Sequence, residues 1–167
     1  NGERLAVSVF GQPESESNKG LLTLLDPTDG TEKLRFDRAI RSTRGLSFSP
    51  DGSLLALRAQ MDASGASRQH VLDVEAGREI WFREAEKWNS DPGWSRDGRW
   101  LALGNMSFEV VDPRTGESRF ANDAHEISTS ASWSPDDRLL TAGDWSGKVS
   151  FTDADSGYVL HRESAHE

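Results

Sequence analysis

The sequence contains no cysteine and no long apolar segment. Without cysteine, the 167-residue chain can form neither disulfides nor thiolate metal sites, and it has no cysteine nucleophile. Its apolar runs are a few residues long, whereas a membrane-spanning helix needs about 20 apolar residues. No charged-then-apolar signal segment opens the chain. We therefore expect a soluble chain without a membrane partner; its compartment is unknown, with the cytoplasm favoured.

Positive charge is also scarce. The chain has 19 Lys and Arg against 28 Asp and Glu, a formal net charge of −9 and a pI near 4.9. An acidic chain repels phosphate backbones, which argues against a nucleic-acid partner. The apolar fraction of 35%, with six Trp and seven Phe, is enough for a buried core.

Two short turn motifs alternate along the chain. Asp or Asn followed by Gly supplies the positive φ of tight two-residue hairpins, and Asp137 is a weaker substitute for that Gly. This first motif occurs at Asn1-Gly2, Asp51-Gly52, Asp97-Gly98 and Asp136-Asp137. In the second motif Asp precedes Gly by four positions, which predicts a type I turn capped by Asp and closed by a left-handed Gly. It occurs at Asp26 and Gly30, Asp73 and Gly77, Asp112 and Gly116, and Asp153 and Gly157.

These turns separate short apolar segments with a period of about 40 to 50 residues, which is typical of propeller blades. The second strand of each unit is predicted at Arg4–Val9, Leu54–Leu57, Trp100–Leu103 and Leu139–Ala142, and the third at Leu21–Leu25, Val71–Val74, Phe108–Val111 and Val149–Thr152. The segment 77–88 is predicted to be a fourth strand. The fold class is all-β, with β-propeller blades built as four-stranded antiparallel meanders. We expect one propeller domain over 1–167, with blades at 1–38, 39–84, 85–123 and 124–167.

These residues resemble the WD-repeat β-propeller family, with degenerate repeats over essentially the whole chain. The Asp after the third strand is retained in each unit, while the family's Trp is replaced by Leu25, Leu72, Val111 and Thr152. The family's Gly-His pair becomes Ala124-His125 and Ala165-His166. The resemblance implies a structural role for His125. It also implies that the family's buried hydrogen-bond network is broken, because Ser146 stands where its Asp is expected.

The first unit lacks its first strand, since the sequence begins at the Asn1-Gly2 turn, and no strand at the other end completes it. Three explanations remain open. The chain is an excerpt of a longer propeller, which we favour, or half of a homodimeric ring, or a small four-bladed ring with one defective blade.

Candidate binding residues lie at one predicted end of the blades. Two long connections, Phe10–Gly20 and Arg58–His70, are predicted there, and inserted loops on a rigid scaffold often carry binding. Each feature also has an alternative explanation without binding. The long connections are then merely tolerated insertions, the arginines of 35–44 lie on a solvated strand edge, and the loop tryptophans pack over the blade ends. The proposed set takes two residues of a basic cluster at 35–44, two arginines of the second connection and two loop tryptophans: Arg41, Arg44, Arg58, Arg68, Trp88 and Trp145.

No motif demands chemistry. Trp94, Trp100 and Trp133 are predicted in the core, and the first strands are poor in His, Asp and Glu, so no catalytic residue, metal or cofactor is predicted. We therefore expect a non-enzymatic scaffold that presents one propeller face to a protein partner. The alternatives are a propeller enzyme or small-ligand propeller using the central channel, and a regulatory propeller domain of a larger signalling protein.

Overall fold

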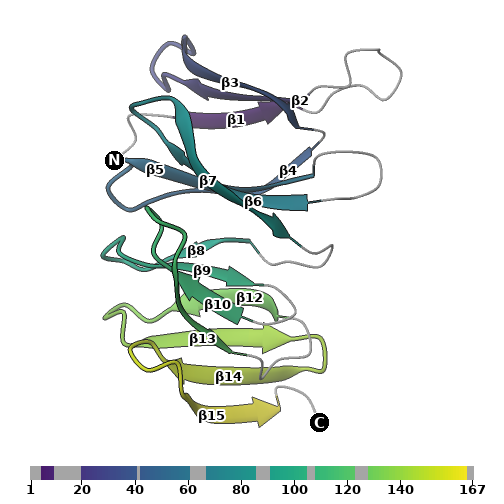
Figure 1. The fold of residues 1–167 in the computed structure, drawn as a ribbon, viewed down its shortest axis with the longest axis vertical. Coiled ribbons are helices and arrows are strands. Elements are labelled where there is room, and N and C mark those ends of the chain that lie inside the picture. Colours follow the sequence, from purple (N-terminus) through teal and green to yellow (C-terminus); the bar gives the residue numbers. More distant parts are fainter. Residues whose placement is uncertain are drawn as a thin grey trace. The chain divides into compact units, whose positions relative to one another are not determined.

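The structure, a computed structural model, describes residues 5–9, 20–40, 42–60, 67–85, 91–104, 108–122 and 128–164. Within these ranges the only regular elements are β-strands, which form four antiparallel sheets (Figure 1). No helix in the described ranges has the length and apolar character needed to span a membrane. The chain divides into two compact units, Asn1–Ala85 and Glu86–Glu167.

The first unit holds two sheets. The first sheet has the order β1-β2-β3, with strands β1 (Leu5–Val9), β2 (Gly20–Leu25) and β3 (Glu32–Ile40). The second sheet is β4-β5-β6-β7, with strands β4 (Ser42–Phe48), β5 (Leu54–Gln60), β6 (Ser67–Asp73) and β7 (Arg78–Ala85). The segment predicted as a fourth strand at 77–88 therefore contains β7.

The second unit also holds two sheets. One contains β8 (Gly93–Trp94), β9 (Leu101–Gly104), β10 (Phe108–Val111) and β11 (Ser118–Asn122). The other contains β12 (Ser128–Trp133), β13 (Leu139–Asp144), β14 (Lys148–Asp153) and β15 (Val159–Ser164). All strand neighbours are consecutive in sequence and antiparallel, so each sheet is a meander. These sheets match propeller blades and confirm the predicted fold class.

Each unit is built around an apolar cluster between its sheets. In the first unit Leu22 and Leu24 of β2 pack with Leu55 and Leu57 of β5. In the second unit Phe108 and Val110 of β10 pack with Leu140 of β13. Leu54 to Ala59 of β5 are all buried, without the alternation of a sheet that has one wet face. This is the burial expected of a strand whose sheet is covered on both faces.

The first turn motif forms a four-residue loop, not the predicted two-residue hairpin. The N–H of Ser49 donates to the Leu54 carbonyl (2.9 Å), which closes the loop, and the N–H of Gly52 donates to the Ser49 carbonyl (2.8 Å). Only the third loop residue has positive φ, at Gly52 (73°), Gly98 (73°) and Asp137 (56°), whereas a type I′ hairpin needs two such residues. The turn is instead stabilised by a serine that the prediction did not use.

That serine is repeated at 49, 95 and 134. In each turn its hydroxyl donates to the Asp two residues later and accepts the N–H five residues later. At the second turn the Ser95 hydroxyl donates to Asp97 Oδ1 (2.8 Å) and accepts from the Trp100 N–H (2.9 Å). Ser95 is fully buried, so this hydroxyl takes the place of water as the acceptor for the backbone N–H that precedes β9.

The second turn motif has the geometry that its spacing predicts. The N–H groups of Gly30, Gly77, Gly116 and Gly157 donate to the carbonyl oxygens of Asp26, Asp73, Asp112 and Asp153 at 2.8–3.0 Å, and all four glycines have positive φ. Gly157 has a further constraint, because a Cβ there would lie 2.7 Å from the Phe120 ring. At Gly30 a Cβ would meet nothing within 4 Å.

This pair of glycines separates backbone strain from packing. Both Gly30→Ala and Gly157→Ala place a Cβ at positive φ, which costs about 1–2 kcal/mol. Gly157→Ala also overpacks the two sheets of the second unit, and we expect a further loss of about 1–3 kcal/mol. Chemical denaturation of the two variants measures the difference. Equal destabilisation would show that Phe120 moves aside without cost.

Candidate binding cleft in the second unit

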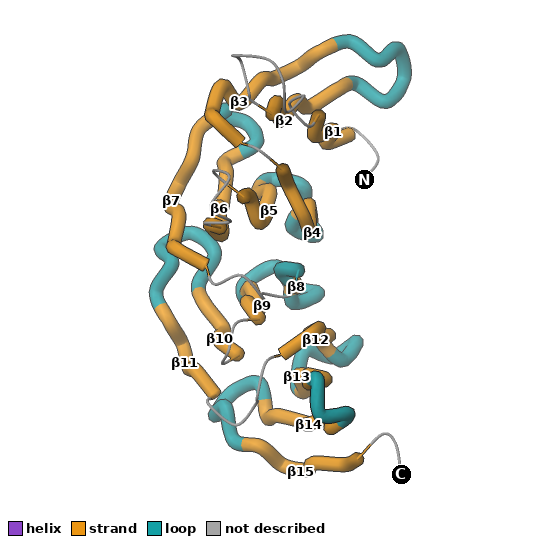
Figure 2. Tube along the Cα trace, turned by 90° about the vertical axis from the view of Figure 1, so that its right-hand side faces the viewer, coloured by secondary structure: helices purple, strands orange, loops and turns teal. Residues whose placement is uncertain are grey.

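The first strands of the second unit's two sheets, β8 and β12, lie side by side (Figure 2). Residues of these strands and of the turns that follow them line an open cleft of about 450 Å³. Its walls combine indole rings, one cation and small polar residues. The lining residues are Gly93, Trp94, Arg96, Ala131, Ser132, Trp133, Ser134 and Pro135. Trp94, Trp100 and Trp133 were predicted in the core. Trp100 and Trp133 are half-buried and pack against the apolar cluster of the second unit. Trp94 is also half-buried, and both Trp94 and Trp133 line this cleft.

The backbones of β8 and β12 approach closely at this cleft. The indole N–H of Trp133 donates to the Gly93 carbonyl oxygen (3.0 Å), so Trp133 crosses from one sheet to the other. A Cβ on Gly93 would lie 3.2 Å from the Ala131 carbonyl oxygen, tighter than an ordinary van der Waals contact. Gly93 therefore permits the spacing that sets the width of the cleft.

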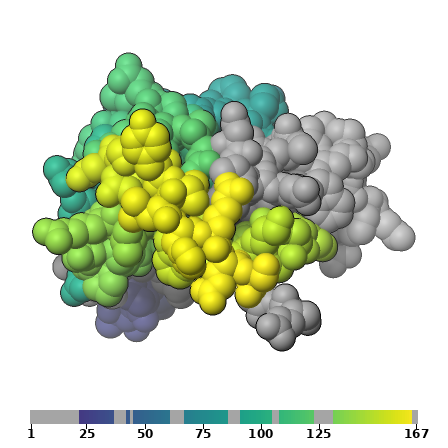
Figure 3. Space-filling view, turned by 90° about the horizontal axis from the view of Figure 1, so that it is seen from below, coloured from purple at the N-terminus to yellow at the C-terminus, as the bar shows by residue number. Residues whose placement is uncertain are grey.

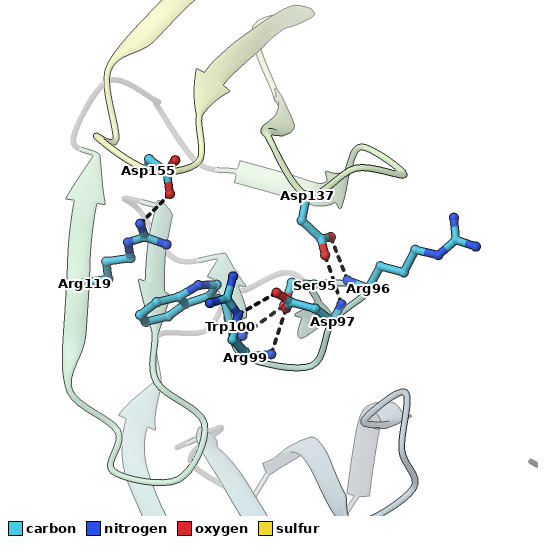
Figure 4. Close-up of polar contacts among 8 residues, drawn as sticks. All are labelled: Ser95, Arg96, Asp97, Arg99, Trp100, Arg119, Asp137 and Asp155. Atoms are coloured by element: carbon cyan, nitrogen blue, oxygen red, sulfur yellow. Dashed lines mark hydrogen bonds and ion pairs between the residues drawn. The ribbon is translucent and has the colours of Figure 1, made fainter.

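Asp137 joins the turns of the two sheets next to the cleft. Its two carboxylate oxygens accept the backbone N–H groups of Arg96 (2.7 Å) and Asp97 (2.9 Å) from the neighbouring turn (Figure 4). Asp137 occupies a position of positive φ that Gly52 and Gly98 hold in the equivalent turns. The carboxylate contacts explain why an aspartate stands there despite the strain.

Asp97 is held in place by its own turn. Its Oδ1 accepts from the Ser95 hydroxyl and from the Arg99 N–H (3.0 Å), and its Oδ2 pairs with the Arg99 guanidinium (2.6 Å). Partial burial is the largest single effect and raises the pKa of Asp97. The hydrogen bonds from Arg99 and Ser95 together outweigh it and hold that pKa below its ordinary value.

A second link joins the two sheets farther from the cleft. The Arg119 guanidinium pairs with Asp155 (2.7 Å) and lies over the Trp100 ring, 4.3 Å from its centroid (Figure 4). Asp155 is 92% exposed, so the ion pair adds little stability in water. The contact with the indole fixes the guanidinium more firmly than the ion pair alone would.

Arg96 differs from its neighbours because its side chain is not used by the turn. Its guanidinium extends away from Asp137 and Asp97 (Figure 4), and the side chain is exposed. Within the part of the chain that the structure describes, Arg96 forms no ion pair, whereas Arg99, Arg119 and Arg138 each pair with an aspartate. The cleft thus has a cation with available donors at its rim.

None of the described residues proposed for binding from the sequence is among those that line this cleft. Arg58 and Arg68 were predicted in a long connection, but β5 and β6 extend through Gln60 and from Ser67, with Arg58 paired to Gln69 and Ala59 to Arg68. Arg58 is buried. Arg68 pairs with Glu84 (2.8 Å) and lies over Phe82, 4.7 Å from its centroid. The ladder of backbone hydrogen bonds therefore continues through a polar sequence that we expected to be loop.

The remaining predicted residues belong to different elements or fall outside the described ranges. Trp145 is 68% exposed in the turn between β13 and β14. Arg44 lies in β4, and Arg41, Trp88 and His125 fall outside the described residues. Thr152, at the family's Trp position, is buried, and its hydroxyl forms no hydrogen bond in the described ranges. A binding role for the proposed set stays a prediction.

The sequence carried a signal for the cleft that was not used. Trp94 and Trp133 occupy equivalent places in two units, each directly before the serine of the first turn. The described ranges contain no group of three His, Asp or Glu side chains arranged to hold a metal ion. The residues that line the cleft offer hydrogen bonding, charge and aromatic contact.

Comparison with known proteins identifies the fold and no more. The sequence matches neither a known protein family nor a curated protein. Among solved structures it is similar to one described as the structure of the Dos1 propeller, with a TM-score of 0.74 and 15% sequence identity. The similarity covers 95% of this chain and 42% of the Dos1 chain. The chain thus has a β-propeller fold and spans less than half of that propeller's length, while the WD-repeat resemblance stays a prediction.

Replacing Asp137 tests whether its carboxylate or its backbone strain dominates. Asp137→Gly relieves the strain of positive φ, worth about 1 kcal/mol, but removes two hydrogen bonds to a charged acceptor. We expect a net loss of about 1–2 kcal/mol in the unfolding free energy, and a smaller loss for Asp137→Asn, which keeps one acceptor oxygen. Urea denaturation measures both. A more stable Asp137→Gly variant would show that the carboxylate contacts contribute little.

The turn aspartates also predict acid sensitivity. The Ser134 hydroxyl, and then the Arg138 N–H, lower the pKa of Asp136, and Ser156 lowers the pKa of Asp153 in the same way. A depressed folded-state pKa adds stability that is present above the unfolded pKa of about 3.9 and is lost as pH falls through the folded value. We expect the melting temperature to decrease as the pH is lowered below about 4, and to decrease less in Asp136→Asn. Stability that rises on acidification from pH 5 to 3 would contradict this.

Proposed function

We propose that the chain is a non-enzymatic protein-interaction scaffold whose binding surface includes the cleft between β8 and β12. One observation carries this proposal: the cleft is open and combines two half-buried indoles with an arginine whose donors are not used by the fold. Trp and Arg are the residues that most often dominate the energy of protein interfaces. A propeller fold by itself implies no particular activity.

The polar groups beside the cleft support binding over catalysis. Asp97, Asp136 and Asp137 are engaged by serine hydroxyls, arginines and backbone N–H groups of the turns. A general base needs a carboxylate that can reach a substrate proton, and these carboxylates are oriented toward their turns. The same cleft could hold a small molecule between its indoles, which is the second candidate function.

A peptide-display experiment tests the proposal. A library of random peptides with no compositional bias is selected against the intact chain and against Ser132→Trp, which fills the cleft from an exposed position. Because the new indole occupies the space between β8 and β12, we expect peptides enriched on the unmodified chain to bind Ser132→Trp at least tenfold more weakly, a loss of about 1.4 kcal/mol.

The matched control is Ser118→Trp, the same change at an exposed serine of β11 outside the cleft. It should retain the peptides, and thermal melts should show that both variants are folded. Peptides that bind all three proteins equally, or the absence of any enriched peptide, would contradict a protein-binding cleft. A small molecule that binds the unmodified chain and Ser118→Trp but not Ser132→Trp would favour the second candidate.

A further inference from the structure

We infer that the cleft takes an acidic segment of a partner protein, with a carboxylate side chain paired to the Arg96 guanidinium beside an apolar residue seated against the indoles of Trp94 and Trp133. This inference rests on the proposed function and names its partner class. It goes beyond a generic scaffold because it assigns a charge and a chemical group to the ligand.

The two turns that border the cleft have balanced formal charges. They contain Arg96, Arg99 and Arg138 against Asp97, Asp136 and Asp137, so their formal charges cancel. Arg99 is bound by Asp97 (2.6 Å), and Arg138 lies 4.0 Å from Asp136. In an acidic chain, this stretch of surface is therefore not repulsive to a further carboxylate.

Asp137 is the aspartate of these two turns that is not paired with Arg99 or Arg138. Both carboxylate oxygens of Asp137 accept backbone N–H groups, and one of these is the N–H of Arg96 itself. Its carboxylate thus fixes the Arg96 backbone while the guanidinium points away (Figure 4). The donors of that guanidinium are left for a group from outside the described chain.

The lining of the cleft favours a carboxylate over a phosphate as the group that pairs with Arg96. A planar guanidinium binds a carboxylate through two parallel hydrogen bonds, and a single arginine is sufficient for that. Recognition of phosphorylated segments uses clusters of arginines, whereas Arg96 is the one arginine among the described residues that line the cleft. The flanking indoles offer flat apolar faces, so the acidic residue should be next to an aromatic, proline or aliphatic residue.

Another exposed surface was weaker as a candidate. On β6 and β7, Arg68 lies over the ring of Phe82, which is 45% exposed, and this resembles an interface anchor. The charge of Arg68 is already matched by Glu84 at 2.8 Å. The last strand, β15, seen in yellow in Figure 3, also exposes residues 160–164.

The test uses two synthetic peptide pools that are identical except at one fixed position, which is Glu in one pool and Gln in the other, flanked by apolar residues. Binding to the intact chain is measured by fluorescence anisotropy at low and high salt. We expect the Glu pool to bind about tenfold more tightly at low salt, with the advantage decreasing as salt rises. Arg96→Gln should abolish the advantage, and Arg96→Glu should reverse it in favour of a third pool with Lys at that position.

Arg162→Glu is the matched control, since it makes the same charge change on an exposed residue of β15, three strands away from β12. It should keep the preference for Glu. Equal binding of the Glu and Gln pools, lost in Ser132→Trp, would overturn the acidic partner and leave the proposed function intact. Binding of the Glu pool that survives in Ser132→Trp would overturn both. Displacement by inorganic phosphate, with no preference between Glu and Gln, would also overturn the inference and favour a phosphorylated partner.

Discussion

The hydrogen bonds that the Asp137 carboxylate accepts from the backbone of the neighbouring turn are the constraint on which the second unit's site depends. They connect the turn after β12 to the turn after β8 at two successive N–H groups. The same sheets meet at Trp133 and Gly93, so the cleft is held at two places. A residue with positive φ is tolerated because its side chain satisfies two donors at once.

The backbone of the turns was largely predictable from the sequence, because turn chemistry is local. Asp and Gly four residues apart specify a capped turn whatever surrounds it, and the four turns of this kind share one geometry. The first motif was assigned the wrong hairpin type because Asp-Gly fits several turns. The serine at 49, 95 and 134, whose hydroxyl bonds both Asp and the strand N–H, decides among them.

The residues that form the cleft were harder to assign, since their surroundings come from another sheet. Trp94 and Trp133 lie on strands, and aromatic residues on strands are usually core, so the prediction placed them there. Whether such a ring is covered depends on the spacing of β8 and β12, which Gly93 sets through a contact 40 or so residues away in sequence. Likewise the polar residues around Arg58 and Arg68 are in strands because β5 and β6 pair with each other along this stretch. Composition alone cannot show that pairing.

The arginines of the second unit differ in whether their side chains stabilise the fold or remain available for binding. Arg99 and Arg119 are committed to aspartates, and Arg119 also covers Trp100, so their charges serve the packing of the sheets. Arg96 contributes only its backbone to that packing. A side chain that the fold does not need can change without unfolding the protein, and that freedom is what a binding residue on a rigid scaffold requires. The turn that fixes the backbone of Arg96 therefore limits its position and leaves its guanidinium available to a partner.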